Sequence, residues 1–131
     1  MRTMTKLNHR SRPTEHTEQV QFVTAVRQFF PHVLVFSIPN GGFRMAKEAS
    51  RLKAEGVLPG VPDLFIPEAR GRSHGLFIEM KRLGLTKSSL SSAQKSVHDQ
   101  LRARGYAVAV CYGFEDAFET FKKYIKRGLH S

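Results

Sequence analysis

The chain has 131 residues, of which 40% are hydrophobic and 24% are charged, a balance that is ordinary for one globular domain. Its 21 Lys and Arg residues outnumber 11 Asp and Glu residues, and the formal net charge of +10 favours a polyanionic partner such as nucleic acid. No apolar run approaches the roughly 20 residues of a membrane span, and the N-terminus lacks the apolar core of a secretory signal. A single cysteine excludes an internal disulfide, and we expect a protein of the reducing cytoplasm.

The N-terminal part of the sequence predicts an arm followed by a helix. Residues 1–13 are rich in arginine and poor in apolar side chains, so we expect a flexible basic arm there. Residues 14–127 are expected to form the folded domain. Thr14 is suited to cap a helix that extends to about Phe30, before a proline, with apolar residues at helical spacing. Glu18 lies on the buried stripe of this helix.

The middle of the chain predicts short strands around a basic helix. Residues 32–38 (HVLVFSI) are expected to form a buried strand, because the run is mostly apolar. The turn at residues 39–42 contains two glycines, which allow the backbone to approach a ligand closely. A basic helix is expected at residues 43–55. Strands are then predicted at residues 63–66 and 75–82, joined by a turn.

The C-terminal part predicts a helix, a strand and a second helix. Ser91 and Gln94 form an S-x-x-Q capping box, which predicts the start of a helix that ends near residue 104. Residues 106–112 predict an apolar strand, in which Cys111 is expected to be core packing rather than a nucleophile. Residues 114–126 predict an amphipathic helix. The resulting order, α-β-α-β-β-α-β-α, fits an α/β fold with a central mixed sheet and helices on both faces.

An acid and a base alternate on the strand predicted at residues 75–82. Glu79 and Lys81 point to the same face of this strand, and burying them is costly unless they are paired or bind something. Asp63 begins the preceding strand, so a hairpin would bring its carboxylate next to that of Glu79. Two carboxylates this close repel each other, and a hard divalent cation usually stabilises such an arrangement.

Phosphodiester hydrolysis requires this set of groups. Asp63 and Glu79 would hold Mg²⁺, while Lys81 would orient the attacking water and neutralise phosphate charge. Glu18 is a candidate to complete the metal shell or to serve a second metal. The alternative is structural: Glu79 and Lys81 form an ion pair on the sheet, and Asp63 only caps a turn. The Gly60-Val61-Pro62-Asp63 segment in a strand–turn–strand context favours the catalytic interpretation.

Six segments, in the same order, resemble the VRR-NUC branch of the PD-(D/E)xK nucleases, especially its small stand-alone phage and bacterial members. The resemblance extends over about residues 15–125. Its segments are Glu18-Gln19, Pro39-Asn40-Gly41-Gly42, Arg51-Leu52-Lys53-Ala54-Glu55-Gly56, Pro59-Gly60-Val61-Pro62-Asp63-Leu64, Gly75-Leu76-Phe77-Ile78-Glu79-Met80-Lys81 and Ser91-x-x-Gln94. The resemblance implies a restriction-endonuclease-like fold, dependence on Mg²⁺ or Mn²⁺, and cleavage of DNA.

The resemblance also implies roles for individual residues. Metal would be surrounded by Glu18, Asp63, Glu79 and the backbone carbonyl of Met80, with Lys81 and Gln94 nearby. Stand-alone members are similar to four-way-junction resolvases and tend to form dimers, which implies branched DNA as substrate and a homodimer. A phage-encoded member would act in the cytoplasm of the host cell.

Two features have both a structural and a functional interpretation. Gln94 is explained by the capping box alone, but the resemblance places it beside the active site, and both interpretations stay open. The Asn40-Gly41-Gly42 turn is either a tight turn only or, with Arg44 and Lys47 after it, a loop that contacts phosphates. Arg51 and Lys53 extend this predicted DNA-binding surface along the basic helix.

The sequence therefore predicts a metal-dependent DNA endonuclease with Asp63, Glu79, Lys81 and Gln94 at its catalytic centre. Two alternatives stay open: a non-catalytic DNA-binding module of the same fold, and a nuclease directed at RNA. The six histidines show no metal-ligand spacing such as H-E-x-x-H, so each is expected to be a surface or packing residue.

Overall fold

The computed structural model describes residues 14–39, 46–85 and 89–128. The predicted basic arm and the turn residues Asn40, Gly41, Gly42 and Arg44 lie outside these ranges. The elements follow the predicted order: α2 (Glu15–Phe29), β1 (Phe36–Ser37), α3 (Ala46–Ala54), β2 (Leu64–Ile66), β3 (Leu76–Lys81), α4 (Ser92–Ala103), β4 (Ala107–Tyr112) and α5 (Phe114–Ile125). Within these ranges, no helix combines the length and apolarity needed to cross a membrane.

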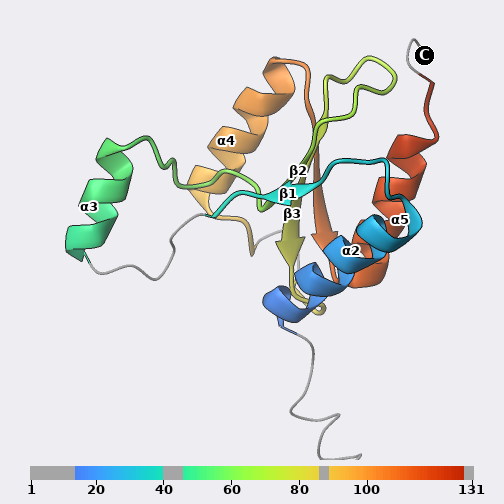
Figure 1. Ribbon diagram of the computed structural model, residues 1–131. Helices are drawn as coiled ribbons and strands as arrows, with labels where there is room; N and C mark the ends of the chain where they lie inside the picture. The colour runs from blue at the N-terminus through green and yellow to red at the C-terminus, as the bar shows by residue number, and fades with distance from the viewer. Residues whose placement is uncertain (1–13, 40–45, 86–88, 129–131) are drawn as a thin grey trace, which may run out of the picture.

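The strands form one mixed sheet in the order β1-β2-β3-β4. β1 and β2 pair antiparallel, β2 and β3 pair antiparallel, and β3 and β4 pair parallel. Helices α2 and α5 pack side by side on one face, α4 covers the other, and α3 stands apart from the sheet (Figure 1). This layered α/β arrangement is the one that the sequence predicts.

Strand β3 is buried along its whole length because helices cover both faces of the sheet. Its apolar side chains, such as Ile78 and Met80, join the core formed with α2 and α5. In that core the rings of Phe22 and Phe121 meet edge to face, with centroids 5.9 Å apart. The opposite side of β3 carries Glu79, which therefore faces α4 in a buried layer.

The strand predicted at residues 32–38 is wrong in both length and burial. Only Phe36–Ser37 pairs with β2, and both residues are exposed. The preceding residues form a turn, in which the Val33 N–H donates to a carbonyl at the end of α2. Val35 turns inward, with 2% of its surface exposed, and Val33 packs partly buried against the core. An apolar run cannot by itself distinguish a buried strand from a turn and a short edge strand.

Glu18 is buried, as its position on the helical stripe predicts, and connects α2 to α5. Its Oε1 accepts a hydrogen bond from the Phe114 N–H at 2.7 Å. That N–H belongs to the first turn of α5, where Gly113 is the N-cap and provides no side-chain cap. The carboxylate therefore takes the place of a capping side chain at a helix end that favours negative charge.

We predict that Glu18→Ala lowers the free energy of unfolding by about 1–3 kcal/mol, because it leaves the partly buried N–H of Phe114 without an acceptor. Glu18→Gln retains an amide oxygen that can accept the same hydrogen bond and should stay close to wild type. Urea denaturation of both variants measures the difference. An equal loss in the two variants would contradict the capping role, whereas a weaker Mn²⁺ affinity in a stable Glu18→Gln protein would support the predicted metal role.

Candidate active site

A cavity of about 510 Å³ lies at the open end of the β2–β3 hairpin, between α3 and the first turn of α4. It collects acidic, basic and amide side chains from elements that are far apart in the sequence. Its lining residues are Glu15, Ala49, Leu52, Lys53, Val57, Pro59, Gly60, Asp63, Glu79, Lys81, Ser91, Ala93 and Gln94. The structure thus brings the predicted residues Asp63, Glu79, Lys81 and Gln94 into one cavity.

The hairpin register places two carboxylates side by side. Leu64 is the partner of Ile78, so Asp63, directly before β2, comes level with Glu79. The Oδ2 of Asp63 accepts a hydrogen bond from the Met80 N–H at 2.7 Å. Because the N–H and C=O of one strand residue lie on the same side, the Met80 carbonyl also points toward this open end of the hairpin.

Glu79 is 4% exposed, and the pKa of its carboxyl is strongly perturbed. Burial, and then the neighbouring Asp63 carboxylate, raise the pKa of Glu79 from 4.5 to about 9, while Lys81 opposes the shift. A metal-free site therefore holds a proton at neutral pH. A cation that replaces this proton would remove the repulsion between the two acids.

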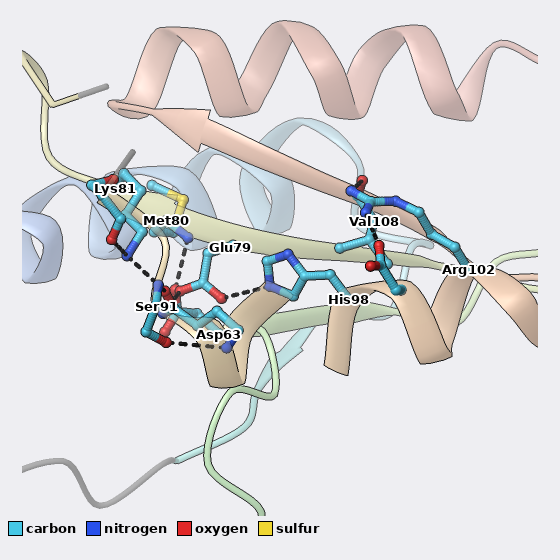
Figure 2. Close-up of polar contacts among 11 residues, drawn as sticks. Asp63, Glu79, Met80, Lys81, Ser91, His98, Arg102 and Val108 are labelled. Atoms are coloured by element: carbon cyan, nitrogen blue, oxygen red, sulfur yellow. Dashed lines mark hydrogen bonds and ion pairs between the residues drawn. The ribbon is translucent and has the colours of Figure 1, made fainter. Parts of the chain in front are cut away.

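Helix α4 contacts Glu79 through two side chains one turn apart, and Figure 2 shows the contact of His98 with Glu79. The Gln94 Nε2 donates to Glu79 Oε2 at 3.1 Å, and His98 Nε2 lies 3.1 Å from Glu79 Oε1. The Lys81 Nζ donates to Gln94 Oε1 at 3.2 Å and reaches the Ser89 carbonyl at 3.5 Å. The direct contacts of the lysine among the described residues are therefore with Gln94 and Ser89, and its charge acts on Glu79 without a direct ion pair.

The contacts of Gln94 combine the two interpretations of the sequence, a helix cap and a residue beside the carboxylates. The capping box is present, since the Gln94 N–H donates to Ser91 Oγ and the Ser91 N–H donates to Gln94 Oε1. The same side chain also links Lys81 to Glu79. A helix cap therefore fixes the amide that connects the acid and the base of the cavity.

Gly60 lets the loop before β2 pack closely on α4. A Cβ at this position would lie 2.4 Å from the Ala93 carbonyl oxygen, and the φ angle of +98° is one that side chains other than glycine rarely adopt. This contact joins the loop that carries Asp63 to the helix turn that carries Gln94. Gly60 is therefore a structural requirement of the site.

The predicted DNA-binding residues are only partly placed. Lys53 lines the cavity from α3, next to Leu52. Arg51 is exposed and forms a 3.5 Å ion pair with Glu55 one turn later. Lys47 lies in α3, but its side chain falls outside what the structure describes. Their contacts with DNA stay predictions.

The donor set suits Mg²⁺ or Mn²⁺ better than zinc. In the described ranges, no three or more His, Cys, Asp and Glu side chains are grouped to hold a metal. Mg²⁺ is usually bound by one or two carboxylates and keeps several waters, which fits Asp63, Glu79 and the Met80 carbonyl. The acid of α2 that lines the cavity is Glu15, whereas the sequence predicted Glu18 as a metal ligand. The Glu18 carboxylate caps α5. A metal-binding role for Glu18 stays a prediction.

The sequence pointed to neither His98 nor Glu15 as a site residue. His98 is 1% exposed and contacts Glu79, although nothing in the local sequence separates it from the other five histidines. The one available signal is spacing, because His98 follows Gln94 by one helical turn and so lies on the same face of α4. Glu15 lies on the margin of the stripe of α2, which gave no reason to prefer it to Glu18.

We predict that Glu79→Gln, the neutral counterpart of the protonated acid, stabilises the metal-free protein above neutral pH. Between pH 4.5 and about 9 the folded state binds one proton more than the unfolded chain at Glu79, so wild-type stability falls as pH rises. A tenfold difference in proton affinity between the folded and unfolded states corresponds to about 1.4 kcal/mol. Melting curves in EDTA should show a flatter pH dependence for the variant and, at pH 8, a melting temperature higher by about 4 °C or more.

The exposed carboxyl of Glu119 supplies the control, because Glu119→Gln should retain the wild-type slope over the same range. Added Mn²⁺ should reverse the order of the two melting temperatures, since it would stabilise wild type and not Glu79→Gln. If the melting temperatures of wild type and Glu79→Gln in EDTA fell equally with pH, the raised pKa of Glu79 would be contradicted.

The comparisons with known proteins agree with this geometry. The model of the VRR-NUC domain matches residues 13–115, which is most of the chain. Among solved structures, a VRR_NUC domain protein is 30% identical, covers 91% of this chain and 93% of its own, and superposes with a TM-score of 0.76. No curated protein gives a significant match. The predicted family and the restriction-endonuclease-like α/β fold are thereby confirmed, and the chain belongs to the VRR-NUC family of nuclease-type domains.

Proposed function

We propose that the protein is a Mg²⁺- or Mn²⁺-dependent endonuclease that hydrolyses phosphodiester bonds of DNA. The observation that carries this proposal is the convergence of Asp63, Glu79 and Lys81 on one cavity. A buried carboxylate next to a half-buried one, together with a buried ammonium, is costly to assemble. Phosphodiester hydrolysis uses this combination, and a structural sheet position would not require it.

Each residue has a defined task in this proposal. Asp63, Glu79 and the Met80 carbonyl hold the metal, which when bound polarises the scissile phosphate and lowers the pKa of a bound water. Lys81 has three N–H donors, two of which contact Gln94 and Ser89, and the third serves to orient water and neutralise phosphate charge. Gln94 fixes the spacing between the lysine and Glu79.

We also propose how DNA reaches the cavity. Lys53 contributes positive charge at the cavity wall, and Arg51 extends this charge along α3. Lys47 is proposed to add to it on the sequence argument alone. Asn40, Gly41, Gly42 and Arg44 are proposed to contact phosphates, on the sequence argument alone. Branched DNA such as a four-way junction is the proposed substrate. A homodimer with two-fold symmetry would place two cavities on two strands.

The test is incubation with labelled linear, flapped and four-way-junction DNA and with labelled RNA, in Mg²⁺ and in EDTA. We expect cleavage in Mg²⁺ only, fastest for the junction, with paired cuts at symmetric positions. Cleavage of RNA alone would redirect the activity to RNA, and unpaired nicks in the junction would contradict the dimer. DNA binding without cleavage in either Mg²⁺ or Mn²⁺ would replace the enzyme by a binding module.

We predict that Lys81→Ala slows single-turnover cleavage by about 10²–10³-fold, since it removes a preorganised charge from the site where negative charge develops. Affinity for DNA should change far less, because one lysine among 21 basic residues supplies few of the phosphate contacts. Lys123→Ala, on the exposed side of α5, is the matched control and should cut at the wild-type rate. A folded Lys81→Ala protein with full activity would remove the lysine from the mechanism.

A further inference from the structure

His98 is the buried histidine of α4, and only one of its two ring nitrogens has a polar contact in the described part of the protein. The side chain is 1% exposed, and Nε2 lies 3.1 Å from Glu79 Oε1. The other nitrogen, Nδ1, is buried and has no hydrogen-bond partner in the described part of the protein. An aliphatic side chain would fill the same space without leaving a polar atom unsatisfied. Packing alone therefore does not account for a histidine here.

When Glu79 is ionised, as it is when it holds a cation, its contact with His98 determines which ring nitrogen carries the proton. An ionised carboxylate only accepts hydrogen bonds, and a neutral imidazole has one donor and one acceptor nitrogen. Toward an ionised Glu79, Nε2 is therefore the donor, and Nδ1 is the bare acceptor. The histidine gives up a hydrogen bond at Nδ1 in order to present an N–H to Oε1.

His98 and Gln94 together hold both oxygens of the same carboxylate. The Gln94 Nε2 donates to Oε2 at 3.1 Å, and His98 Nε2 lies 3.1 Å from Oε1 and donates to it when Glu79 is ionised. The two side chains come from positions one turn apart on α4. A single contact would allow the carboxylate to rotate about its terminal bond, whereas two contacts on different oxygens fix its plane. Each oxygen has a second lone pair, so this support leaves an acceptor site on each for a cation.

We propose that His98 is a positioning residue that fixes the plane of the Glu79 carboxylate for metal binding through its Nε2–H. The inference rests on the proposed role of Glu79 as a metal ligand. Hydrogen-bonded partners of ligating carboxylates orient the ligand, and their loss typically weakens metal binding by about 10–100-fold. His98 itself touches neither the metal nor the substrate in this proposal.

The test compares substitutions that do or do not return an N–H to the position of Nε2. The amide nitrogen of His98→Gln is as many bonds from the backbone as Nε2, whereas that of His98→Asn is one bond shorter. His98→Leu fills the space without a donor, and His32→Gln, at an exposed site, is the matched control. Isothermal titration with Mn²⁺ in the absence of DNA measures the affinity, and melting curves establish that each variant is folded.

We expect Mn²⁺ affinity to fall about 10–100-fold in His98→Asn and His98→Leu and to be largely restored in His98→Gln. If His98→Leu does not fold, the comparison of the Gln and Asn variants decides, since both place an amide in the same pocket. Wild-type affinity in His98→Asn, or an equal loss in His98→Asn and His98→Gln, would overturn the inference while the proposed function stands. Wild-type protein that neither binds Mn²⁺ nor cleaves DNA would overturn both.

Discussion

The antiparallel register between β2 and β3 is the constraint on which the rest of the site depends. With Leu64 opposite Ile78, the apolar side chains of β3 enter the core, and Asp63 comes level with Glu79. A slip of one residue would turn Glu79 into the apolar layer and Ile78 toward α4. Core packing and the convergence of the carboxylates are therefore specified by the same hydrogen bonds.

Helix α4 supplies hydrogen-bond partners for the buried charged groups of the hairpin. Glu79 is 4% exposed and Lys81 8% exposed, and charges buried to this degree require partners. Gln94 bonds to both, and the capping box and the close contact with Gly60 hold the start of α4 against the cavity. Burial, and then the neighbouring Asp63 carboxylate, still raise the pKa of Glu79, because Lys81 offsets them only in part. Such a site is stable when protonated or when it holds a cation.

Much of the fold was predictable because its signals are local. The capping box at Ser91, the period of the helices and the alternation along β3 depend on neighbouring residues only. The prediction of a buried strand at residues 32–38 was wrong because the conformation of this run depends on where it meets the sheet. Its strand, β1, is at the edge of the sheet, and β2 is too short to pair with more of it. Local apolarity carries no information about the length of the neighbouring strand.

The sequence by itself determined the order of the elements, the family and the placement of Glu79 and Lys81 on one face of a strand, since a period of two requires no tertiary information. It also identified Asp63, because the hairpin that joins it to Glu79 is short. Only the tertiary structure decided that His98 and Glu15 belong to the site and that the Glu18 carboxylate caps α5. These three assignments depend on how α4, α2 and α5 pack on the sheet, and the contacts that fix this packing join residues far apart in the chain.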